Sequence, residues 1–417
     1  MRTQIFLFIL ILTAGGCTSG PDASKTTGQP ELRPLLLVSF DGFRHDYLDL
    51  ADTPVFDSLS GESVRSRGLI PVFPTKTFPG HYSIATGLHP GHTGLIANTM
   101  YDPRREAWFR ISDRSAVEDP FWYDGEPIWN TVEKQGGRAG TMFWVGSEAP
   151  VQEMRPTWWK RYDGSMPNEA RIDTVVKWLS LPGEEAADLA TLYFDLVDAA
   201  GHDYGVPSDS LRAAIREADR LMGYLMKRLG EEGLAGRVNL LVVSDHGMTA
   251  QSAERIIVLD EIVDLDHTER VMWDPVTWIE PKEGMEDSLY RQLSAAADGG
   301  PFRVYRKNEL PERFRLYGHP RVTGLVLVAD PGYTVLRSDW RRDFVASLPG
   351  ATHGYDNALP SMRGYFLATG PAFRSDTTVE AFGAIHLYEL MNLVMGTKPA
   401  PNDGSPDSVR VLLKDPR

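Results

Sequence analysis

Three apolar segments of the sequence each lead into an acidic residue, and this pattern constrains the fold more than any other feature. The segments are Leu-Leu-Leu-Val-Ser-Phe before Asp41, Leu-Tyr-Phe-Asp-Leu-Val before Asp198, and Val-Asn-Leu-Leu-Val-Val-Ser before Asp245 and His246. Short apolar runs rich in β-branched and aromatic residues are typical of buried strands. Because ligands bind at the carboxyl ends of strands in open α/β sheets, the pattern predicts such a sheet with a polar site at one edge.

The spacing of acidic residues and histidines favours a metal site. Asp198 and His202 are four residues apart, so a helical turn would place a carboxylate and an imidazole, an ordinary pair of zinc ligands, on one face. Asp245 and His246 are adjacent, and they can share a metal only if the strand ends just before them. His353 lies in a loop-like segment and is a further candidate. Each residue alone is more often a cap, turn or surface residue, but together at strand ends they favour a metal site.

A threonine-containing segment predicts a helix whose start binds an anion. Thr77 fits the N-cap, Pro79 fits the first turn, and Gly87 fits the end of the helix. A helix start directs free N–H groups and the positive end of its dipole at a bound group, which suits a phosphate. An alcohol becomes a good nucleophile when a base or a metal removes its proton, so Thr77 is a candidate nucleophile. The alternative is that Thr77 only caps the helix.

Seven short motifs follow one another between roughly residues 35 and 370. They are Phe40-Asp41-Gly42-Phe43-Arg44, Pro74-Thr-Lys-Thr77-Phe78-Pro79, Asn98-Thr-Met-Tyr-Asp102, Phe143-Trp144, Asp198-x-x-Gly-His202, Ser244-Asp245-His246-Gly247-Met248 and His353-Gly354. In this order they resemble the motifs of the nucleotide pyrophosphatase/phosphodiesterase family, bacterial type, of the alkaline phosphatase superfamily. One departure is Gly80, where the family often has asparagine. The resemblance implies an α/β fold with an alkaline phosphatase-like core, in which a mostly parallel central sheet is flanked by helices and a smaller inserted or capping lobe is present.

The resemblance also implies two Zn²⁺ ions and a covalent mechanism. One zinc would be held by Asp198, His202 and His353, and the other by Asp41, Asp245, His246 and the oxygen of Thr77. Two metals about 4 Å apart can clamp the attacking and leaving oxygens of an in-line displacement. Thr77 would attack phosphorus as a metal-bound alkoxide, and a water on the first metal would hydrolyse the resulting phospho-threonine. Asn98, helped by the backbone N–H of Thr77, would donate a hydrogen bond to a non-bridging oxygen; the alternative is a turn asparagine.

The expected substrate is a small nucleotide. The resemblance places Phe78 and Tyr162 on either side of a nucleobase with Tyr193 nearby, although such aromatic residues are also ordinary core residues. The formal net charge is −14 and no basic stripe is evident, which argues against binding to long nucleic acids. We therefore expect hydrolysis of nucleotide phosphodiester or pyrophosphate bonds with release of nucleoside 5′-monophosphates.

Two alternatives stay open on the sequence alone. A phosphomonoesterase on the same metal pair needs a further cation at the phosphate, and Arg44 is close enough in sequence to supply it. A non-catalytic lipoprotein that binds nucleotides is the second alternative. The complete ligand set and Thr77 argue against it, because binding alone needs no nucleophile.

The N-terminus predicts export. Residues 1–17 combine Arg2, a short apolar stretch and the sequence Ala14-Gly-Gly-Cys17, which is similar to a bacterial lipoprotein cleavage box except that Ala14 stands where leucine is usual. We expect a periplasmic or outer-membrane-anchored protein attached to the membrane only by a lipid on Cys17, the single cysteine. The alternative is simple cleavage and release.

The remaining chain predicts one catalytic domain. Residues 18–33 are rich in Gly, Ser, Thr, Pro and Asp and predict a flexible tether, residues 34–400 form the expected catalytic domain, and residues 401–417 form a C-terminal tail. Mixed strand and helix signals between about 255 and 345 predict the smaller lobe. Apolar residues at helical spacing predict helices at 208–229 and 385–395.

Overall fold

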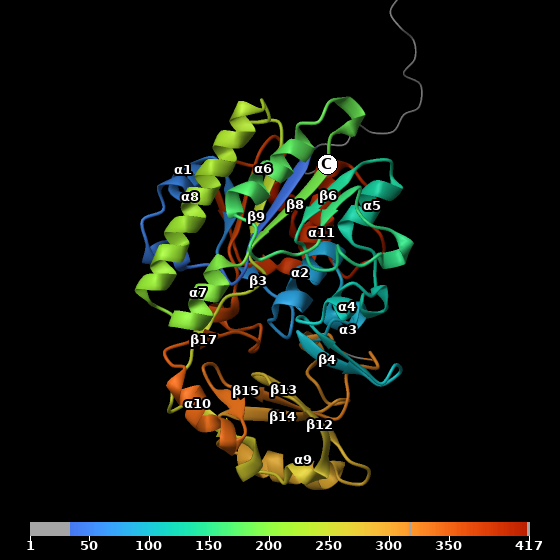
Figure 1. The fold of residues 1–417 in the computed structure, drawn as a ribbon, viewed down its shortest axis with the longest axis vertical. Coiled ribbons are helices and arrows are strands. Elements are labelled where there is room, and N and C mark those ends of the chain that lie inside the picture. Colours follow the sequence, from blue (N-terminus) through green and yellow to red (C-terminus); the bar gives the residue numbers. More distant parts are fainter. Residues whose placement is uncertain (1–33, 317, 415–417) are drawn as a thin grey trace, which may run out of the picture. The chain divides into compact units, whose positions relative to one another are not determined.

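An eight-stranded sheet forms the centre of the fold, in the order β19-β2-β18-β9-β1-β8-β6-β7 (Figure 1). The computed structural model describes residues 34–316 and 318–414, so the expected signal at 1–17, Cys17 and the tether at 18–33 lie outside the described residues. The strands are β19 Thr377–Val379, β2 Val64–Ser66, β18 Phe366–Thr369, β9 Asn239–Val243, β1 Leu35–Phe40, β8 Leu189–Phe194, β6 Ala139–Met142 and β7 Trp158–Lys160.

The sheet is mostly parallel, as the sequence predicts. Strand β1 pairs in parallel with β8 and β9, and β6 pairs in parallel with β8 and β7, whereas β18 is antiparallel to both of its neighbours. All six residues of β1 are buried. A strand buried on both faces reads as a continuous apolar run, which is why β1 was recognisable in the sequence.

Helices cover both faces of the sheet. Alternate residues of β1 point to opposite faces, so each face has its own apolar core against helices. Leu36 and Val38 belong to one apolar core with α1 (Pro54–Gly61), α6 (Asn168–Leu179) and α8 (Asp209–Glu231). Leu35 and Leu37 belong to another core with α2 (Thr77–Thr86), α5 (Ile128–Lys134) and α11 (Leu387–Met395). The expected helix at 208–229 is α8, and that at 385–395 begins as a 3₁₀ turn (Ala384–His386) before α11.

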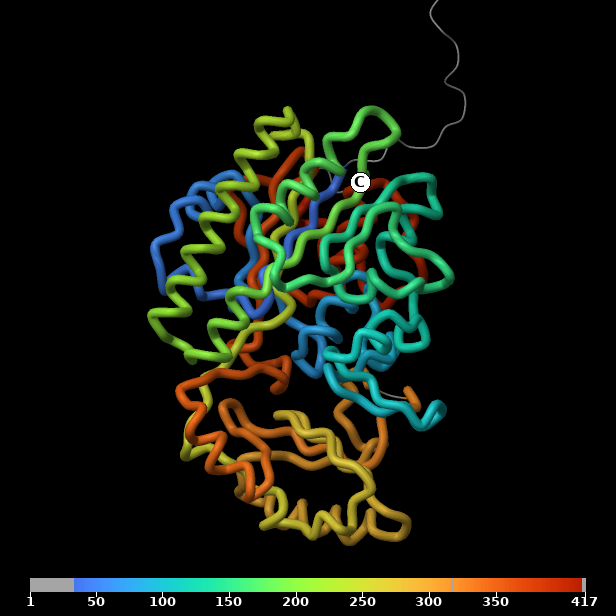
Figure 2. The backbone as a smooth tube through the Cα atoms, in the orientation of Figure 1, coloured from blue at the N-terminus to red at the C-terminus, as the bar shows by residue number. Residues whose placement is uncertain are grey.

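A smaller lobe is inserted between β9 and the last strands of the large sheet. Its antiparallel sheet has the order β12-β13-β15-β14, formed by Thr268–Met272, Val276–Pro281, Leu325–Ala329 and Phe302–Arg306, and α9 (Glu286–Ala297) packs on it through Leu289 and Leu293. Figure 2 shows the yellow chain entering this lobe and the orange chain leaving it. The chain returns through α10 (Arg341–Ala346) and β17 (Ala351–Thr352), immediately before His353. The predicted inserted lobe is therefore present.

Shorter elements complete the fold. They are β3 Leu69–Ile70, α3 Pro90–Thr93, β4 Thr99–Asp102, β5 Ala107–Arg110, α4 Arg114–Val117, α7 Leu196–Tyr204, β10 Thr249–Ala250, β11 Ile256–Val258, β16 Thr334–Leu336 and β20 Phe382–Gly383. In the segment expected to be a tail, Val409 and Leu412 are buried in the same core as α11. A buried ion pair links the two lobes, since Arg321 Nε lies 2.7 Å from Asp102 Oδ2 and both side chains are fully buried.

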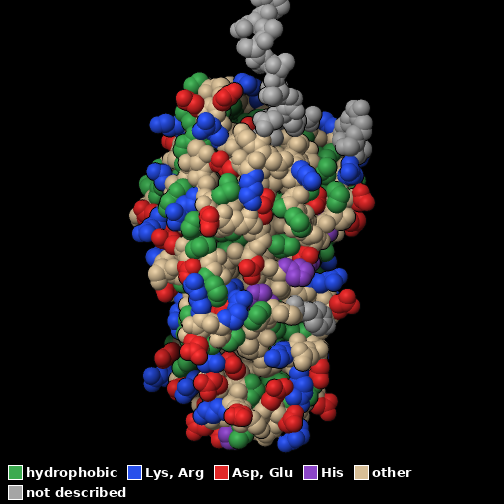
Figure 3. Space-filling model, turned by 90° about the vertical axis from the view of Figure 1, so that its right-hand side faces the viewer, with side chains coloured by type: hydrophobic (Ala, Val, Ile, Leu, Met, Phe, Trp, Pro, Cys, Tyr) green, Lys and Arg blue, Asp and Glu red, His purple; other side chains and the backbone are tan. Residues whose placement is uncertain are grey.

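The surface carries charges of both signs. Figure 3 shows Lys and Arg side chains interspersed with Asp and Glu over one face of the molecule. Among residues 34–316 and 318–414, no helix is both long and apolar enough to span a membrane.

Candidate metal and catalytic site

Six of the predicted ligands form two groups. Asp198, His202 and His353 make up one group, and Asp41, Asp245 and His246 make up the other. Within each group every residue offers one ligand atom, and these atoms all lie within 4.8 Å of one another. The groups adjoin, because the rings of His246 and His353 stack with their centroids 3.6 Å apart. The seventh predicted ligand, Thr77, has its Oγ1 3.4 Å from His246 Nε2.

The end of β1 brings Asp41 close to α7. Asp41 directly follows the strand, and Gly42 then turns the chain with a φ of +65°. A Cβ atom on Gly42 would lie 2.8 Å from Asp198 Oδ1, which is too close for any side chain. Glycine is therefore required here both for the backbone conformation and for the approach of the two ligand groups.

Helix α7 holds Asp198 and His202 on one face. His202 Nε2 lies 3.5 Å from Asp198 Oδ2, as the spacing of four residues predicts. The strand prediction for this segment was too long, however, because β8 stops at Phe194 and α7 starts at Leu196. Asp198 thus lies in the first turn of a helix rather than at a strand end.

The adjacent residues Asp245 and His246 follow the end of β9 at Val243. The sequence predicted that these two side chains could share a metal only if the strand ended just before them. The strand does end there, and both side chains belong to the ligand group that includes Asp41. Ser244 Oγ donates a hydrogen bond to the His246 carbonyl oxygen at 2.8 Å, which fixes the turn after the strand.

Backbone carbonyls orient the three histidines. A carbonyl can only accept, so each Nδ1 carries its proton and each Nε2 is left as an acceptor available to a cation. The three contacts are His202 Nδ1 to Ala351 O at 2.9 Å, His246 Nδ1 to Gly247 O at 3.0 Å and His353 Nδ1 to Thr75 O at 2.8 Å.

The carboxylates are buried close together and incompletely paired. Within the described part of the chain, Asp41 Oδ1, Asp198 Oδ1 and Asp245 Oδ2 accept no hydrogen bond. Burial, followed by repulsion from the neighbouring carboxylates, raises the pKa of Asp41 well above its usual value. Burial also lowers the pKa of His246 well below its ordinary value, so its imidazole is neutral. Unpaired carboxylate oxygens beside neutral imidazole nitrogens fit divalent cations.

The start of α2 differs from the prediction by one residue. Lys76, with extended backbone angles, is the N-cap, and Thr77 is the first helical residue; no side chain makes a capping hydrogen bond. The prediction that Thr77 is the N-cap is therefore wrong. Its hydroxyl points towards His246 instead of a backbone N–H, so it is available for chemistry. Gly87 ends the helix with a φ of +68°, as predicted.

Asn98 lies beside the candidate nucleophile. Its Oδ1 accepts a hydrogen bond from the backbone N–H of Phe78 at 3.0 Å. This bond fixes the orientation of the Asn98 amide. Its Nδ2 group donates to no residue that the structure describes and is therefore available as a donor to a ligand. Phe78 itself packs edge-on against Phe109, with ring centroids 5.6 Å apart.

Tyr162 and Tyr193 are neighbours with different environments. The Tyr162 side chain is partly exposed at 37%, and its hydroxyl donates to Asp195 Oδ2 at 2.8 Å. Its ring centroid lies 6.4 Å from that of Tyr193. The Tyr193 hydroxyl donates to Asp41 Oδ2 at 2.6 Å, so Tyr193 contacts a candidate metal ligand directly.

Sequence reasoning missed the role of His81. This residue is fully buried, and its Nε2 lies 2.8 Å from Ser39 Oγ. Its Nδ1 lies 3.0 Å from the Thr77 carbonyl oxygen and 3.2 Å from Asp245 Oδ2. The available signal was its position four residues after Thr77, which places both on one side of the helix.

Two nearby cations are already paired. Arg44 binds Asp46 through Nε at 2.6 Å and donates to the Met248 carbonyl oxygen at 3.0 Å. Lys76 Nζ lies 2.9 Å from Asp274 Oδ1, a residue of the smaller lobe. Two of these contacts were not evident from the sequence. Asp274, the partner of Lys76, and Met248, whose carbonyl oxygen accepts from the Arg44 side chain, each lie about two hundred residues away along the chain.

The fold and the two ligand groups define an α/β protein with a candidate two-cation centre beside a helix start. A model of the type I phosphodiesterase / nucleotide pyrophosphatase family matches residues 35–356. The chain is 36% identical to human ectonucleotide pyrophosphatase/phosphodiesterase family member 5 over 385 residues, which cover 92% of this chain and 79% of that protein. It is 37% identical over 396 residues to a venom phosphodiesterase of Crotalus durissus collilineatus, with 93% of this chain and 47% of that protein covered.

A comparison with solved structures gives the same family. Murine ectonucleotide pyrophosphatase/phosphodiesterase 5, in an inactive threonine-to-alanine form in complex with AMP, matches with a TM-score of 0.86 and 36% identity, covering 92% of this chain and all of that one. The chain belongs to the type I phosphodiesterase / nucleotide pyrophosphatase family, within the alkaline phosphatase superfamily. It spans about half the length of several curated relatives, for example 44% of the rat family member 1.

Proposed function

We propose that this protein is a zinc-dependent hydrolase of nucleotide phosphodiester and pyrophosphate bonds that releases nucleoside 5′-monophosphates. The observation that supports this most is the Thr77 hydroxyl at the start of α2, 3.4 Å from His246 Nε2 and beside two adjacent groups of oxygen and nitrogen ligands. The names of the relatives and the AMP complex of the murine protein support a nucleotide as the substrate.

Two Zn²⁺ ions fit the two groups. Asp198, His202 and His353 would hold one ion, and Asp41, Asp245 and His246 with the Thr77 oxygen would hold the other. When bound, two such cations would supply positive charge to the phosphoryl oxygens and lower the pKa of the attacking hydroxyl.

The residues of the chain have separate roles in attack on phosphorus, in binding the phosphoryl oxygens and in binding the base. Thr77 Oγ1 forms a bond to phosphorus while the bond from phosphorus to the leaving oxygen breaks; the hydroxyl proton passes to solvent water, and the leaving group departs with the electron pair of the broken bond. The phosphoryl group on Thr77 still carries the nucleoside, so water that next attacks phosphorus displaces Thr77 and releases the nucleoside monophosphate. Asn98 Nδ2 and the backbone N–H of Thr77 hold the non-bridging oxygens, and Phe78 and Tyr162 hold the base by stacking. The inactive threonine-to-alanine form of the murine relative agrees with an essential threonine.

The pairing of the nearby cations favours diesters over monoesters. A phosphate monoester carries one more negative charge, which a monoesterase usually neutralises with an additional Arg or Lys. Arg44 is bonded to Asp46 and Met248, and Lys76 is paired with Asp274. We therefore propose the diesterase rather than the phosphomonoesterase that the sequence left open.

The test compares two substrates and one covalent product. The zinc-loaded protein should hydrolyse a bis-aryl phosphate much faster than the mono-aryl ester. Acid quenching during turnover of the bis-aryl phosphate, followed by mass spectrometry, should find an aryl phosphoryl group on the peptide that contains Thr77. A higher rate on the monoester would reject the proposed diesterase activity. Absence of a phosphoryl group on the Thr77 peptide under single-turnover conditions would reject the covalent step.

Export and lipid attachment at Cys17 are also proposals, supported by the sequence alone. Incorporation of labelled palmitate into the wild-type protein and not into Cys17→Ala would support them. Equal incorporation in both would reject attachment at this residue.

A further inference from the structure

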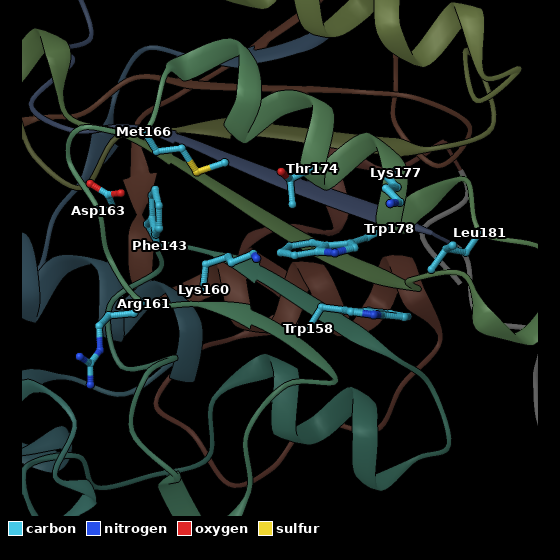
Figure 4. A pocket seen from close by; sticks show the side chains of 10 residues that line it. All are labelled: Phe143, Trp158, Lys160, Arg161, Asp163, Met166, Thr174, Lys177, Trp178 and Leu181. Carbon is cyan, nitrogen blue, oxygen red and sulfur yellow. The ribbon is translucent and has the colours of Figure 1, made fainter.

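A pocket of about 670 Å³ lies at one edge of the eight-stranded sheet, and its lining includes none of the candidate ligands (Figure 4). Its walls come from the edge strand β7, the loop after β7 and helix α6. The residues that matter below are Phe143, Trp158, Lys160, Lys177 and Trp178. A volume of this size is within the usual range for small-molecule sites, roughly 300–1,000 Å³.

Two indole rings give the pocket flat apolar walls. Trp158 of β7 and Trp178 of α6 are nearly parallel, with centroids 6.4 Å apart and an interplanar angle of 18°. Trp178 lies against Gly140 of β6, where a Cβ atom would be 2.6 Å from its ring. The ring therefore depends on a glycine in the neighbouring strand. In the described ranges, neither indole N–H has a hydrogen-bond partner, so both remain donors for a ligand.

Two unpaired ammonium groups accompany these rings. Lys160 and Lys177 line the pocket, and neither forms an ion pair with any residue that the structure describes. The other cation, Arg161, is paired with Glu118 at 2.7 Å and points away from the indoles in Figure 4. The pocket contains one carboxylate, Asp163, which accepts hydrogen bonds from Ser165. The lining is therefore locally positive, in a chain whose formal net charge is −14.

We propose that this pocket is a second nucleotide-binding site that takes a nucleoside monophosphate. Indole faces bind a nucleobase by stacking, and two ammonium groups can pair with the phosphate dianion. A ligand that is both aromatic and dianionic uses both features, whereas a neutral ring or inorganic phosphate uses only one. The proposal goes beyond the proposed function and does not depend on catalysis by Thr77.

The pocket is separate from the proposed base slot but contacts it. Phe143 lines the pocket, and its ring packs edge-on against Tyr162 with centroids 5.2 Å apart. Tyr162 itself is not part of the lining. We therefore expect one nucleotide on each side of the contact between these two rings.

Equilibrium dialysis of labelled AMP against the zinc-loaded full chain tests the proposal. We expect two AMP molecules per chain, and weaker binding of adenosine and of inorganic phosphate at the second site. The double variant Lys160→Glu/Lys177→Glu and the variant Trp158→Ala should each lower the affinity of this site by about tenfold or more. Activity on an aryl nucleotide ester should be retained, because none of these residues belongs to the catalytic site.

Trp159→Ala is the matched control. Trp159 follows Trp158 in β7, so its side chain points to the opposite face of the sheet. There the Arg155 guanidinium carbon lies 4.8 Å from the centroid of the Trp159 ring. This variant should keep both sites. If catalysis at Thr77 is wrong and AMP binds only in the pocket, the chain will bind one AMP that the lysine variant removes. The proposal is overturned if AMP binding is unchanged in the lysine double variant, or if Trp158→Ala and Trp159→Ala behave alike.

Discussion

The hydrogen bond from Tyr193 to Asp41 is expected to control metal affinity. Tyr193→Phe keeps the ring and removes only the hydroxyl, which donates to Asp41 Oδ2 at 2.6 Å. Asp41 is buried, and its other carboxylate oxygen accepts no hydrogen bond from any residue that the structure describes. Loss of a hydrogen bond to a charged group of this kind costs about 1.5–3 kcal/mol. That range corresponds to about a ten- to a hundredfold lower affinity for the ion held by Asp41, as is usual for residues that orient metal ligands.

Activity titrated with zinc in a metal-buffered solution measures this effect. The midpoint for Tyr193→Phe should move to a higher free zinc concentration, while the rate at saturating zinc should approach that of the wild type. Tyr162→Phe is the control, because its hydroxyl donates to Asp195, which belongs to neither ligand group. An unchanged midpoint for Tyr193→Phe would refute the orienting role and return Tyr193 to the substrate-binding role that the sequence predicted.

Four further outcomes are expected. Thr77→Ala should lower turnover by about three orders of magnitude or more while nucleotide affinity survives, and Thr77→Ser should keep a measurable fraction, as measured on an aryl nucleotide ester after contaminating phosphatase is excluded. Tyr162→Ala should lower catalytic efficiency about ten- to a hundredfold on a thymidine 5′-aryl ester and little on a methyl aryl phosphate, and an equal fall on both would make Tyr162 structural. Arg321→Met should lower the free energy of unfolding by about 3–5 kcal/mol, because it removes the fully buried partner of Asp102; Arg104→Met, which removes a half-exposed partner of the same carboxylate, should cost much less in denaturant titrations. Chelation should make stability depend on pH: above about pH 7 the site histidines, whose pKa burial lowers, are neutral in both the folded and the unfolded chain, whereas burial raises the pKa of Asp41 and Asp245, the latter to about 8, so the folded metal-free protein binds more protons than the unfolded chain and its melting temperature should fall as the pH rises from about 7 to about 8. A melting temperature that rises over this range would contradict the last expectation.

The local parts of the site could be predicted because their signals lie in short stretches of sequence. A continuous apolar run marks β1, and the spacing of four residues between Asp198 and His202 marks one face of α7. The seven candidate ligands come together in the structure, although Asp198 lies in the first turn of α7 and not at a strand end as the sequence predicted. The one-residue error at Thr77 has a local cause, since its hydroxyl contacts His246 rather than a backbone N–H.

The supporting contacts could not be predicted because they depend on strand register. In the parallel pair of β1 and β8, Ser39 stands opposite Tyr193, which allows the Tyr193 hydroxyl to reach Asp41 two residues further on. A shift of one residue would turn Tyr193 to the other face of the sheet. Nothing in either strand alone specifies that pairing. The same applies to His81, which becomes a neighbour of Asp245 only when α2 packs beside the end of β9.

The smaller lobe contacts the candidate site through the residues just before Thr77. His353 Nδ1 contacts the Thr75 carbonyl oxygen at 2.8 Å, and the backbone N–H of Gly354 donates to Thr75 Oγ1 at 2.9 Å. On the next residue, Lys76 pairs with Asp274 of the lobe. The chain that returns from the lobe therefore supplies a candidate metal ligand and, by the same contacts, fixes the segment that leads into Thr77, the candidate nucleophile. Because one loop performs both tasks, the position of the lobe and the position of Thr77 relative to the ligands cannot vary independently.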